Sequence, residues 1–549
     1  MRPRWTILIL IALVLGACAP AATPTPTAAP PPAPAASPTP LPPSPTPAPK
    51  VLVVARAKMD IRTLDPHRQY EIAPPQIMRA AYETLVTLGE KGADITKIEP
   101  LLAESYEVSP DAKVYTFRLR KGVKFHTGNE MTAEDVVFSF RRLGNLKDNP
   151  SWLFSDHVES IEAVDPYTVR ITLKEPNAAF LAMLVSPNFA VVDSKAVREK
   201  GGTDAPDADK TDKATDWLNQ NSAGTGPFIL REWKEKEHVI LERNPNYWRT
   251  PPAIDRIVIR DIPDPTAQLQ ALERGEVDIA QSLDVDLIAR LRASGKAQII
   301  EGYTLDMIYL AITMNPEISR ELADKRVRQA IMYAIDYDGI IKDLMRGAAV
   351  HLPTVIPLGL IGTDPNLAPR RDLEKARALM KEAGYEKGFT VKMVFPTATF
   401  VGGLPAETLA AKLQADLAEI GIKLELEPRE TVAWRADYRA GKLAITIADW
   451  TPDFLDPHGW AIPFAVKGAS AAKRVYYENP KAEELAVRAG QITDVDERAR
   501  MYLELQRIFL DDATYIGLIQ PKVYIAAAPG VKGVVYNPVY FIDYYYIEK

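Results

Sequence analysis

Cysteine is nearly absent from this chain. One cysteine in 549 residues, Cys18, excludes an intramolecular disulfide, CxxC redox chemistry and cysteine-based zinc sites. Histidine is also scarce, and no two of the six histidines lie within one helical turn of each other. We therefore expect no metal site built from neighbouring ligands.

An excess of basic residues is missing as well. The chain has 66 lysines and arginines against 72 acidic residues, which gives a formal net charge of −6. A protein that binds nucleic acid has to neutralise a phosphate backbone, and this composition offers no basic surplus for that purpose. We expect no nucleic-acid partner.

The common catalytic and nucleotide-binding motifs are absent too. The sequence contains no G-x-x-x-x-G-K-[ST], H-E-x-x-H or G-x-S-x-G. Gly224-Thr225-Gly226-Pro227 lacks the third glycine of a dinucleotide-binding loop and places proline where a helix should offer N–H groups. We expect no enzyme, no catalytic residue and no cofactor.

No run of 18 apolar residues occurs, and the longest apolar stretch lies near the start. Arg2 and Arg4 precede an apolar core at 5–15, which is shorter than the roughly 20 residues that span a bilayer. This pattern predicts a secretory signal peptide over 1–18. Leu15-Gly16-Ala17-Cys18 resembles the bacterial lipobox, so Cys18 is the predicted lipidation site; an ordinary signal peptide with an incidental cysteine is the alternative.

Residues 19–49 are dominated by proline, which makes up fourteen of these 31 residues. Such a segment cannot bury a core and favours extended polyproline II, so we interpret it as a linker. The remaining body, 50–549, would be a soluble part tethered outside the cytoplasm to the cell membrane.

The body alternates strand and helix patterns. Apolar runs predict strands at 51–55, 307–312, 390–395, 422–427 and 443–449, and helical spacing predicts helices at 74–88, 265–274, 284–294, 324–345, 372–384, 406–420, 481–489 and 494–512. Alternation over 106–125 predicts a β-hairpin that turns at 109–112. Thr132 and Asp135 resemble a capping box. Residues 201–223 should form an exposed loop, with or without a short helix. This order favours an α/β fold.

A series of blocks along the body resembles the family 5 extracellular solute-binding proteins, the dipeptide-, oligopeptide- and nickel-binding group of ABC importers. The blocks occur in the family's order and cover about 50–549: Pro100–Tyr106, Ser109–Asp111, Tyr115–His126, Thr132–Phe140, Glu175–Leu181, Gly224–Phe228, Arg243–Trp248, Leu272–Asp278, Arg326–Ile331, Glu374–Met380 and Leu417–Ile422. Most of these residues fit structural roles.

The resemblance implies a periplasmic-binding-protein fold of the type II kind, with two α/β lobes that close on a ligand and an extra domain on the first lobe. Carried onto this chain, the first lobe's core takes 50–83, 223–304 and 515–549, the extra domain 84–222, and the second lobe 305–514. The chain would cross between the lobes near 304 and 514, which would form the hinge.

The segment Trp450-Thr451-Pro452-Asp453-Phe454-Leu455-Asp456-Pro457 resembles the W-x-x-D-x-x-D-P element of this family. In peptide-binding members, the aspartate at the place of Asp453 pairs with the ligand's α-ammonium. The backbone around Trp450 and Thr451 would then add strand-like hydrogen bonds to the peptide main chain. A capping role for Asp453 and a core role for Trp450 are the alternatives. Tyr70 would border the cleft, whereas His67 should be structural.

One position departs from the family pattern. Members commonly have Phe-Asn-Thr after the first crossing strand, and here Ile312 and Thr313 stand in that region.

The resemblance implies a monomeric lipoprotein that binds di- or oligopeptides and delivers them to an ABC permease and its ATPase. An oligosaccharide ligand, a nickel chelate, and a secreted hydrolase or stalked adhesin are the alternatives, in decreasing order.

Overall fold

The computed structural model describes residues 21–22, 49–57, 59–71, 73–89, 92–451 and 453–549. The predicted signal peptide, Cys18 and nearly all of the predicted linker lie outside these ranges. Residues 49–549 form one compact unit, which starts next to the composition boundary at Lys50. Within the described ranges, no helix has both the length and the apolarity needed to cross a bilayer.

The first part of this unit is built on one end of a twelve-stranded sheet, in the order β18-β11-β1-β10-β9-β8. β1 runs parallel to β10 and β11, whereas β9 is antiparallel to both of its neighbours. The bounds are Val51–Arg56 for β1, Phe228–Lys234 for β8, His238–Arg243 for β9, Arg256–Asp261 for β10, Ile279–Ala280 for β11 and Gln298–Tyr303 for β12. Helices α1 (Pro75–Ala81), α8 (Pro265–Glu273) and α9 (Val285–Ser294) accompany them.

The helix predicted at 74–88 ends early. α1 stops at Ala81, and the chain then passes into strand β2. The cause lies at Glu83, whose buried carboxylate accepts hydrogen bonds from Tyr247 Oη (2.7 Å), Trp248 Nε1 (2.7 Å) and Thr225 Oγ1 (2.8 Å). These distant partners hold Glu83 in a non-helical position that local periodicity does not reveal.

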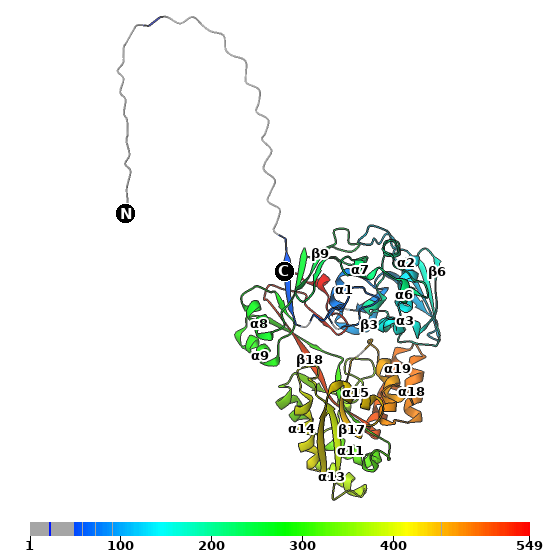
Figure 1. The fold of residues 1–549 in the computed structure, drawn as a ribbon, viewed down its shortest axis with the longest axis vertical. Helices are drawn as coiled ribbons and strands as arrows, with labels where there is room; N and C mark the ends of the chain where they lie inside the picture. Colours follow the sequence, from blue (N-terminus) through cyan, green and yellow to red (C-terminus); the bar gives the residue numbers. More distant parts are fainter. Residues whose placement is uncertain (1–20, 23–48, 58, 72, 90–91, 452) are drawn as a thin grey trace. The chain divides into compact units, whose positions relative to one another are not determined.

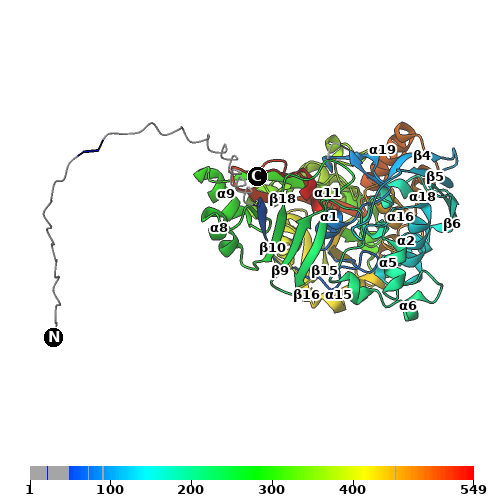
Figure 2. The same cartoon turned by 90° about the horizontal axis from the view of Figure 1, so that it is seen from above.

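Residues 84–222 form separate small sheets and short helices. The predicted hairpin is present as β4 (Ala103–Val108) and β5 (Val114–Leu119), in the four-stranded order β4-β5-β7-β6. The other elements are β2 (Val86–Gly89), β3 (Asp94–Pro100), β6 (Val158–Asp165), β7 (Thr168–Leu173), α2 (Ala133–Asn145), α3 (Trp152–Ser155), α4 (Phe180–Met183), α5 (Ser194–Glu199), α6 (Ala208–Thr211) and α7 (Thr215–Leu218). The carboxylate of Asp135 accepts from Thr132 N (2.8 Å), as a capping box requires. Figure 2 shows this region and the α8–α9 pair on opposite sides of β8–β10.

The second part continues the sheet in the order β16-β15-β17-β13-β18. Its strands are β13 (Met307–Ile312), β14 (Ala349–His351), β15 (Phe389–Pro396), β16 (Ile422–Arg429) and β17 (Ile445–Trp450). Its helices are α10 (Arg320–Ala323), α11 (Lys325–Ala334), α12 (Tyr337–Gly339), α13 (Leu373–Glu382), α14 (Ala406–Ala418), α15 (Thr431–Arg439), α16 (His458–Ala465), α17 (Ala472–Val475), α18 (Pro480–Gly490) and α19 (Val495–Asp512). The helix predicted at 324–345 is broken, because Asp336 caps α12 and its N–H bonds to Asp416.

One strand, β18 (Tyr515–Ala527), belongs to both parts (Figure 1). It pairs with β13 up to Ile519 and with β12 from Lys522 onward, so the chain passes between the two parts at Gln520–Pro521, beyond position 514. The buried Gln520 amide donates to Thr304 O (2.8 Å) and Leu358 O (3.0 Å). Thr304 N donates to Pro521 O (3.1 Å), which ties the two crossing segments together. After β18, the chain forms β19 (Tyr536–Asn537) and β20 (Phe541–Ile542).

The two glycines of the Gly224-Thr225-Gly226-Pro227 segment have a packing role. A Cβ on Gly224 would lie 2.2 Å from Ala81 O, and one on Gly226 would lie 2.6 Å from Ala80 O. Only glycine allows the backbone to approach the end of α1 this closely. The segment precedes β8, as expected of a turn before a strand.

A fully buried ion cluster fixes the loop that follows β1. The Arg142 guanidinium donates to both carboxylate oxygens of Asp65 (2.8 and 2.6 Å) and of Asp212 (2.8 and 2.9 Å). It also donates to Nδ1 of His67 (3.0 Å), so the Nε2–H of His67 is directed to Ala190 O (3.0 Å). Burial, followed by the Arg142 charge, lowers the pKa of His67 to about 4, and the neutral ring is structural as predicted.

Replacing Arg142 with methionine should destabilise the protein strongly, because Asp65 and Asp212 would lose their hydrogen-bonded counter-ion and keep only the more distant Arg68, at 3.8 and 3.7 Å. We expect a loss of about 3–5 kcal/mol in the free energy of unfolding, measured by urea titration. Arg170→Met is the matched control, since Arg170 pairs with Glu162 at the surface, and its unfolding curve should match that of the unmodified protein. Equal stability of the two variants would contradict the role of the cluster.

Candidate functional site

A cavity of about 790 Å³ lies where the two parts of the unit meet at the crossing segments. Its volume falls in the range of small-molecule binding sites. Most of its walls come from nine separated stretches of the chain, which are 69–71, 186–188, 281–285, 304–306, 344–348, 401–403, 451 with 453–455, 522–524 and 536–541. Three of the predicted site residues, Tyr70, Thr451 and Asp453, line it.

Asp453 faces the cavity just beyond the end of β17. Its Oδ1 accepts a hydrogen bond of 2.6 Å from the Tyr70 hydroxyl, which in turn accepts one of 3.2 Å from Trp152 Nε1. Tyr70 and Asp453 are 383 positions apart in the sequence, and both side chains are accessible to solvent. No Lys, Arg or His of the described chain forms an ion pair with Asp453, so a hydroxyl is its partner in this structure.

Protein surrounding the Asp453 carboxyl raises its pKa, and the Tyr70 hydrogen bond opposes part of that rise. The same environment, together with the Asp453 charge, raises the pKa of Tyr70, which therefore remains a neutral donor. A carboxylate with one hydroxyl donor keeps further lone pairs available for a ligand.

The Tyr70 loop is held from both sides. Arg142 fixes Asp65, and Asn188 Nδ2 donates to Pro66 O (3.0 Å) and Gln69 O (2.8 Å). Because these donors lie on side chains that are themselves buried, the loop presents Tyr70 to the cavity in a defined position.

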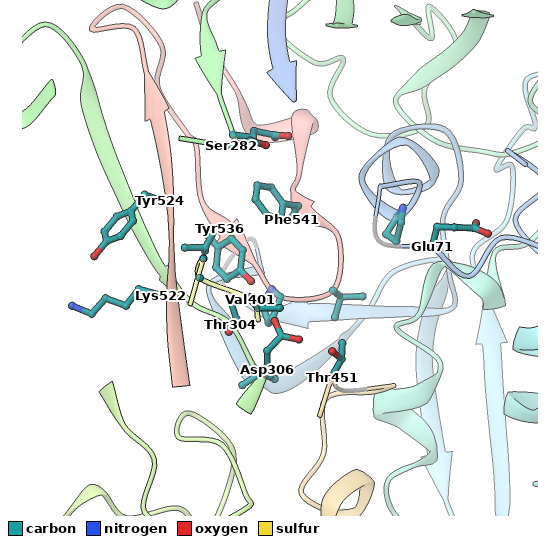
Figure 3. A pocket seen from close by; sticks show the side chains of 18 of the residues that line it. Glu71, Ser282, Thr304, Asp306, Val401, Thr451, Lys522, Tyr524, Tyr536 and Phe541 are labelled. Carbon is teal, nitrogen blue, oxygen red and sulfur yellow. The ribbon is translucent and has the colours of Figure 1, made fainter. Parts of the chain in front are cut away.

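A second carboxylate, Asp306, faces the same cavity from the crossing segment between β12 and β13. Met307 pairs with Trp450 in the sheet, so Asp306 stands opposite Thr451, and Figure 3 shows these two side chains next to each other. The surrounding protein raises the pKa of Asp306; hydrogen bonds from Thr451 and Thr304 oppose this rise, and the Asp449 charge adds to it. Sequence reasoning missed Asp306, although it borders the predicted crossing at 304.

Trp450 is half-buried and packs away from the cavity lining. Its ring meets Phe464 edge-on at 5.1 Å between centroids, and Arg474 lies 5.7 Å above it. The role of Trp450 as a ligand contact remains a prediction.

Thr313, the position that departs from the family pattern, is fully buried, and its N–H donates to Ala444 O (2.9 Å).

Asp456 combines turn chemistry with an ion pair. Its Oδ1 accepts from His458 N (2.9 Å), as an aspartate in a turn does, and from the Arg498 guanidinium (2.7 Å). Both side chains are buried. The two aspartates of the 450–457 segment therefore have different environments, with Asp453 towards the cavity and Asp456 in the core.

The C-terminal segment supplies aromatic walls that the sequence did not point to. Tyr536 and Phe541 lie over the side of the cavity opposite Thr451 (Figure 3), and Tyr524 joins them from β18. Arg56 lies behind Phe541, with its guanidinium 4.9 Å from the ring centroid. The only sequence signal was the aromatic richness of 515–549.

Comparison with known proteins places this geometry in a family. The model of the bacterial extracellular solute-binding proteins, family 5 middle region, matches residues 97–472. The chain is 31% identical over 495 residues to a probable D,D-dipeptide-binding periplasmic protein of Escherichia coli, covering 89% of this chain and 92% of that protein. It is 30% identical over 484 residues to heme-binding protein A of Haemophilus influenzae, covering 84% and 86%.

A solved structure, HbpA2 from Haemophilus parasuis, superposes with a TM-score of 0.81 at 27% identity, over 91% of this chain and 99% of that one. The predicted two-lobed α/β fold of the periplasmic-binding-protein type is thereby confirmed.

Removing the Tyr70 hydroxyl should raise the pKa of Asp453 further, because its hydrogen bond stabilises the ionised carboxylate. We expect Tyr70→Phe to shift the titration of Asp453 to higher pH in ¹³C NMR spectra of protein labelled at aspartate carboxyls, with Asp453→Asn assigning the resonance. Tyr106→Phe is the matched control, since the Tyr106 hydroxyl donates to Ile98 O instead. An unchanged or lowered midpoint in Tyr70→Phe would show that the hydrogen bond is not formed in solution.

Proposed function

The chain belongs to the bacterial extracellular solute-binding proteins of family 5, and from this premise we propose that it captures di- or oligopeptides in the cavity and delivers them to an ABC importer. Family members and the named relatives are binding proteins, and the family is extracellular by its description. In this proposal the protein acts as a monomer without catalysis or cofactor, and its partners are the membrane permease and ATPase.

The observation that carries the proposal is the environment of Asp453. A carboxylate in a cavity, without a cationic partner in the described chain, is the natural counter-ion for an ammonium group. Every peptide with an unblocked N-terminus carries such a group, whatever its side chains are. Backbone groups near Thr451 would add main-chain hydrogen bonds of the kind that read peptides without regard to side chains.

A second candidate is an oligosaccharide, the alternative that the sequence left open. It is favoured by the aromatic side chains that line the cavity, because sugar rings stack on aromatic faces: Tyr70, Phe454, Tyr524, Tyr536 and Phe541. Heme, which the name of one relative suggests, has two anionic propionates that would meet carboxylates here. A nickel chelate would find no histidine among the described lining residues.

Asp453→Asn should weaken binding of a tripeptide with an unblocked N-terminus by about 2–5 kcal/mol, measured by isothermal titration calorimetry, because the ammonium loses its charged partner. An N-acetylated tripeptide should bind both proteins equally and weakly. Asp449→Asn is the control: this aspartate lies two residues before Thr451, outside the lining.

The affinity for the tripeptide should also fall as the pH drops through the raised pKa of Asp453, since the protonated carboxyl no longer pairs with the ammonium.

Oligosaccharide binding that Asp453→Asn leaves unchanged, with no binding of any tripeptide, would contradict the peptide proposal. Native mass spectrometry of the protein purified without denaturation separates the same two outcomes. Retained adducts at peptide masses support the proposal, and adducts spaced by hexose or pentose units support the sugar candidate.

The membrane attachment in this proposal rests on Cys18, which is the single cysteine and ends the lipobox-like segment. With two or more acyl chains at Cys18, the anchor would be stable, since each buried CH₂ contributes about 0.8 kcal/mol. In an expressing bacterium, we expect the protein that retains Cys18 to be found in the membrane fraction and to partition into detergent. The Cys18→Ser variant should lack the mass of the lipid in mass spectrometry. A Cys18→Ser protein with unchanged mass, apart from the substitution, would contradict lipidation.

A further inference from the structure

Negatively charged side chains outnumber positively charged ones in the cavity lining. Among the described lining residues there are four carboxylates and one ammonium: Glu71, Asp284, Asp306, Asp453 and Lys522. Two of the carboxylates have roles within the protein. Glu71 lies 3.6 Å from the Arg62 guanidinium, and Asp284 caps α9 by accepting from Leu287 N (2.9 Å).

The ammonium does not offset the other two carboxylates. Lys522 Nζ lies 3.6 Å from Glu301, and Figure 3 shows its side chain directed away from Asp306 and Thr451. Arg56 stays behind the Phe541 ring, outside the lining. Asp306 and Asp453 therefore each face the cavity with a hydroxyl group as a hydrogen-bond partner, which is Thr451 for Asp306 and Tyr70 for Asp453.

Hydroxyl donors hold a carboxylate in place without neutralising it. A second charge of the same sign in a cavity is costly unless a ligand cation compensates for it. The same imbalance disfavours an anionic group of the ligand, because the lining offers no cation directed at it. Both effects select for a ligand with a net positive charge.

We propose that the site is specific for basic peptides, with the α-ammonium held at Asp453 and a side-chain amine or guanidinium held at Asp306. This inference rests on the proposed function and makes it narrower. Asp306 lies on the crossing segment that links β12 to β13, and Asp453 lies beyond β17 on the second part of the sheet. A ligand with two cationic groups would thus contact both the hinge and the second lobe, whereas a peptide with one cationic group would leave Asp306 uncompensated.

The experiment compares near-isosteric tripeptides by isothermal titration calorimetry. Lysine or norleucine is placed at each of the three positions of tri-alanine, so that the members of a pair differ by one ammonium group. At one position or more, we expect the lysine peptide to bind at least tenfold more tightly than its norleucine partner. Asp306→Asn, which keeps the size and acceptor oxygen of the side chain, should reduce that ratio to about one by weakening the lysine peptide alone. Circular dichroism and thermal unfolding report whether the variant is folded.

Asp449→Asn is the control for a diffuse electrostatic effect, because Asp449 is near enough to raise the pKa of Asp306 but does not line the cavity. It should retain most of the lysine preference. An equal loss in both variants would overturn Asp306 as the contact, and tripeptides that bind without a lysine preference at any position would overturn the inference while the proposed function stands. If no tripeptide binds the unmodified protein, the proposed function fails and this inference fails with it.

Discussion

A single strand shared by two halves of the sheet is the constraint on which the site depends. β18 pairs with β13 before Gln520 and with β12 after Pro521, so the residues at this crossover belong to both halves at once. The Gln520 amide donates to Thr304 O on the other crossing segment and to Leu358 O in the loop after β14, and its oxygen accepts from Leu358 N. The cavity opens beside this point, and its walls come from segments that are hundreds of residues apart in the sequence. No short stretch of the chain could form this site alone.

The protein uses charged groups differently in its core and in its cavity. In the core, Asp65 and Asp212 share the Arg142 guanidinium, and Asp456 pairs with Arg498, so buried charge is neutralised internally. In the cavity, Asp306 and Asp453 are supported by hydroxyl groups instead. The first arrangement orders loops, including the one that presents Tyr70, and the second leaves negative charge available to a ligand. Glu83 is a core carboxylate that also has neutral donors, which are Tyr247, Trp248 and Thr225. Asp306 and Asp453 differ from Glu83 because they line the cavity, where a ligand can reach them.

Local patterns predicted much of the fold because period and burial act over a few residues. β13 over Met307–Ile312 and the hairpin around 109–112 follow directly from alternation and apolar runs. The errors occur where distant partners override local preference: Glu83 ends α1 early through bonds to Tyr247 and Trp248, and Asp336 interrupts the long helix through Asp416. In the site, the family-like segment pointed to Asp453 and Thr451, both of which line the cavity. Asp306 and the C-terminal aromatics carry no motif, and only the tertiary structure brings them there.

Pro521 gives the crossover a mechanical property that ordinary strand residues would not. Its carbonyl accepts from Thr304, but its ring nitrogen has no hydrogen to donate, so β18 lacks one interstrand donor at the position where the two halves of the sheet join. When β18 bends at Pro521, no hydrogen bond donated by this residue is broken, because proline has no N–H to donate. Relative movement of the lobes is therefore more easily accommodated as a pivot about Pro521 than as a slide along β18, because a slide would break the regular pairings on both sides of it. In such a pivot the residues nearest the axis, Thr304 to Asp306, are displaced least, while the distant walls of the cavity travel furthest.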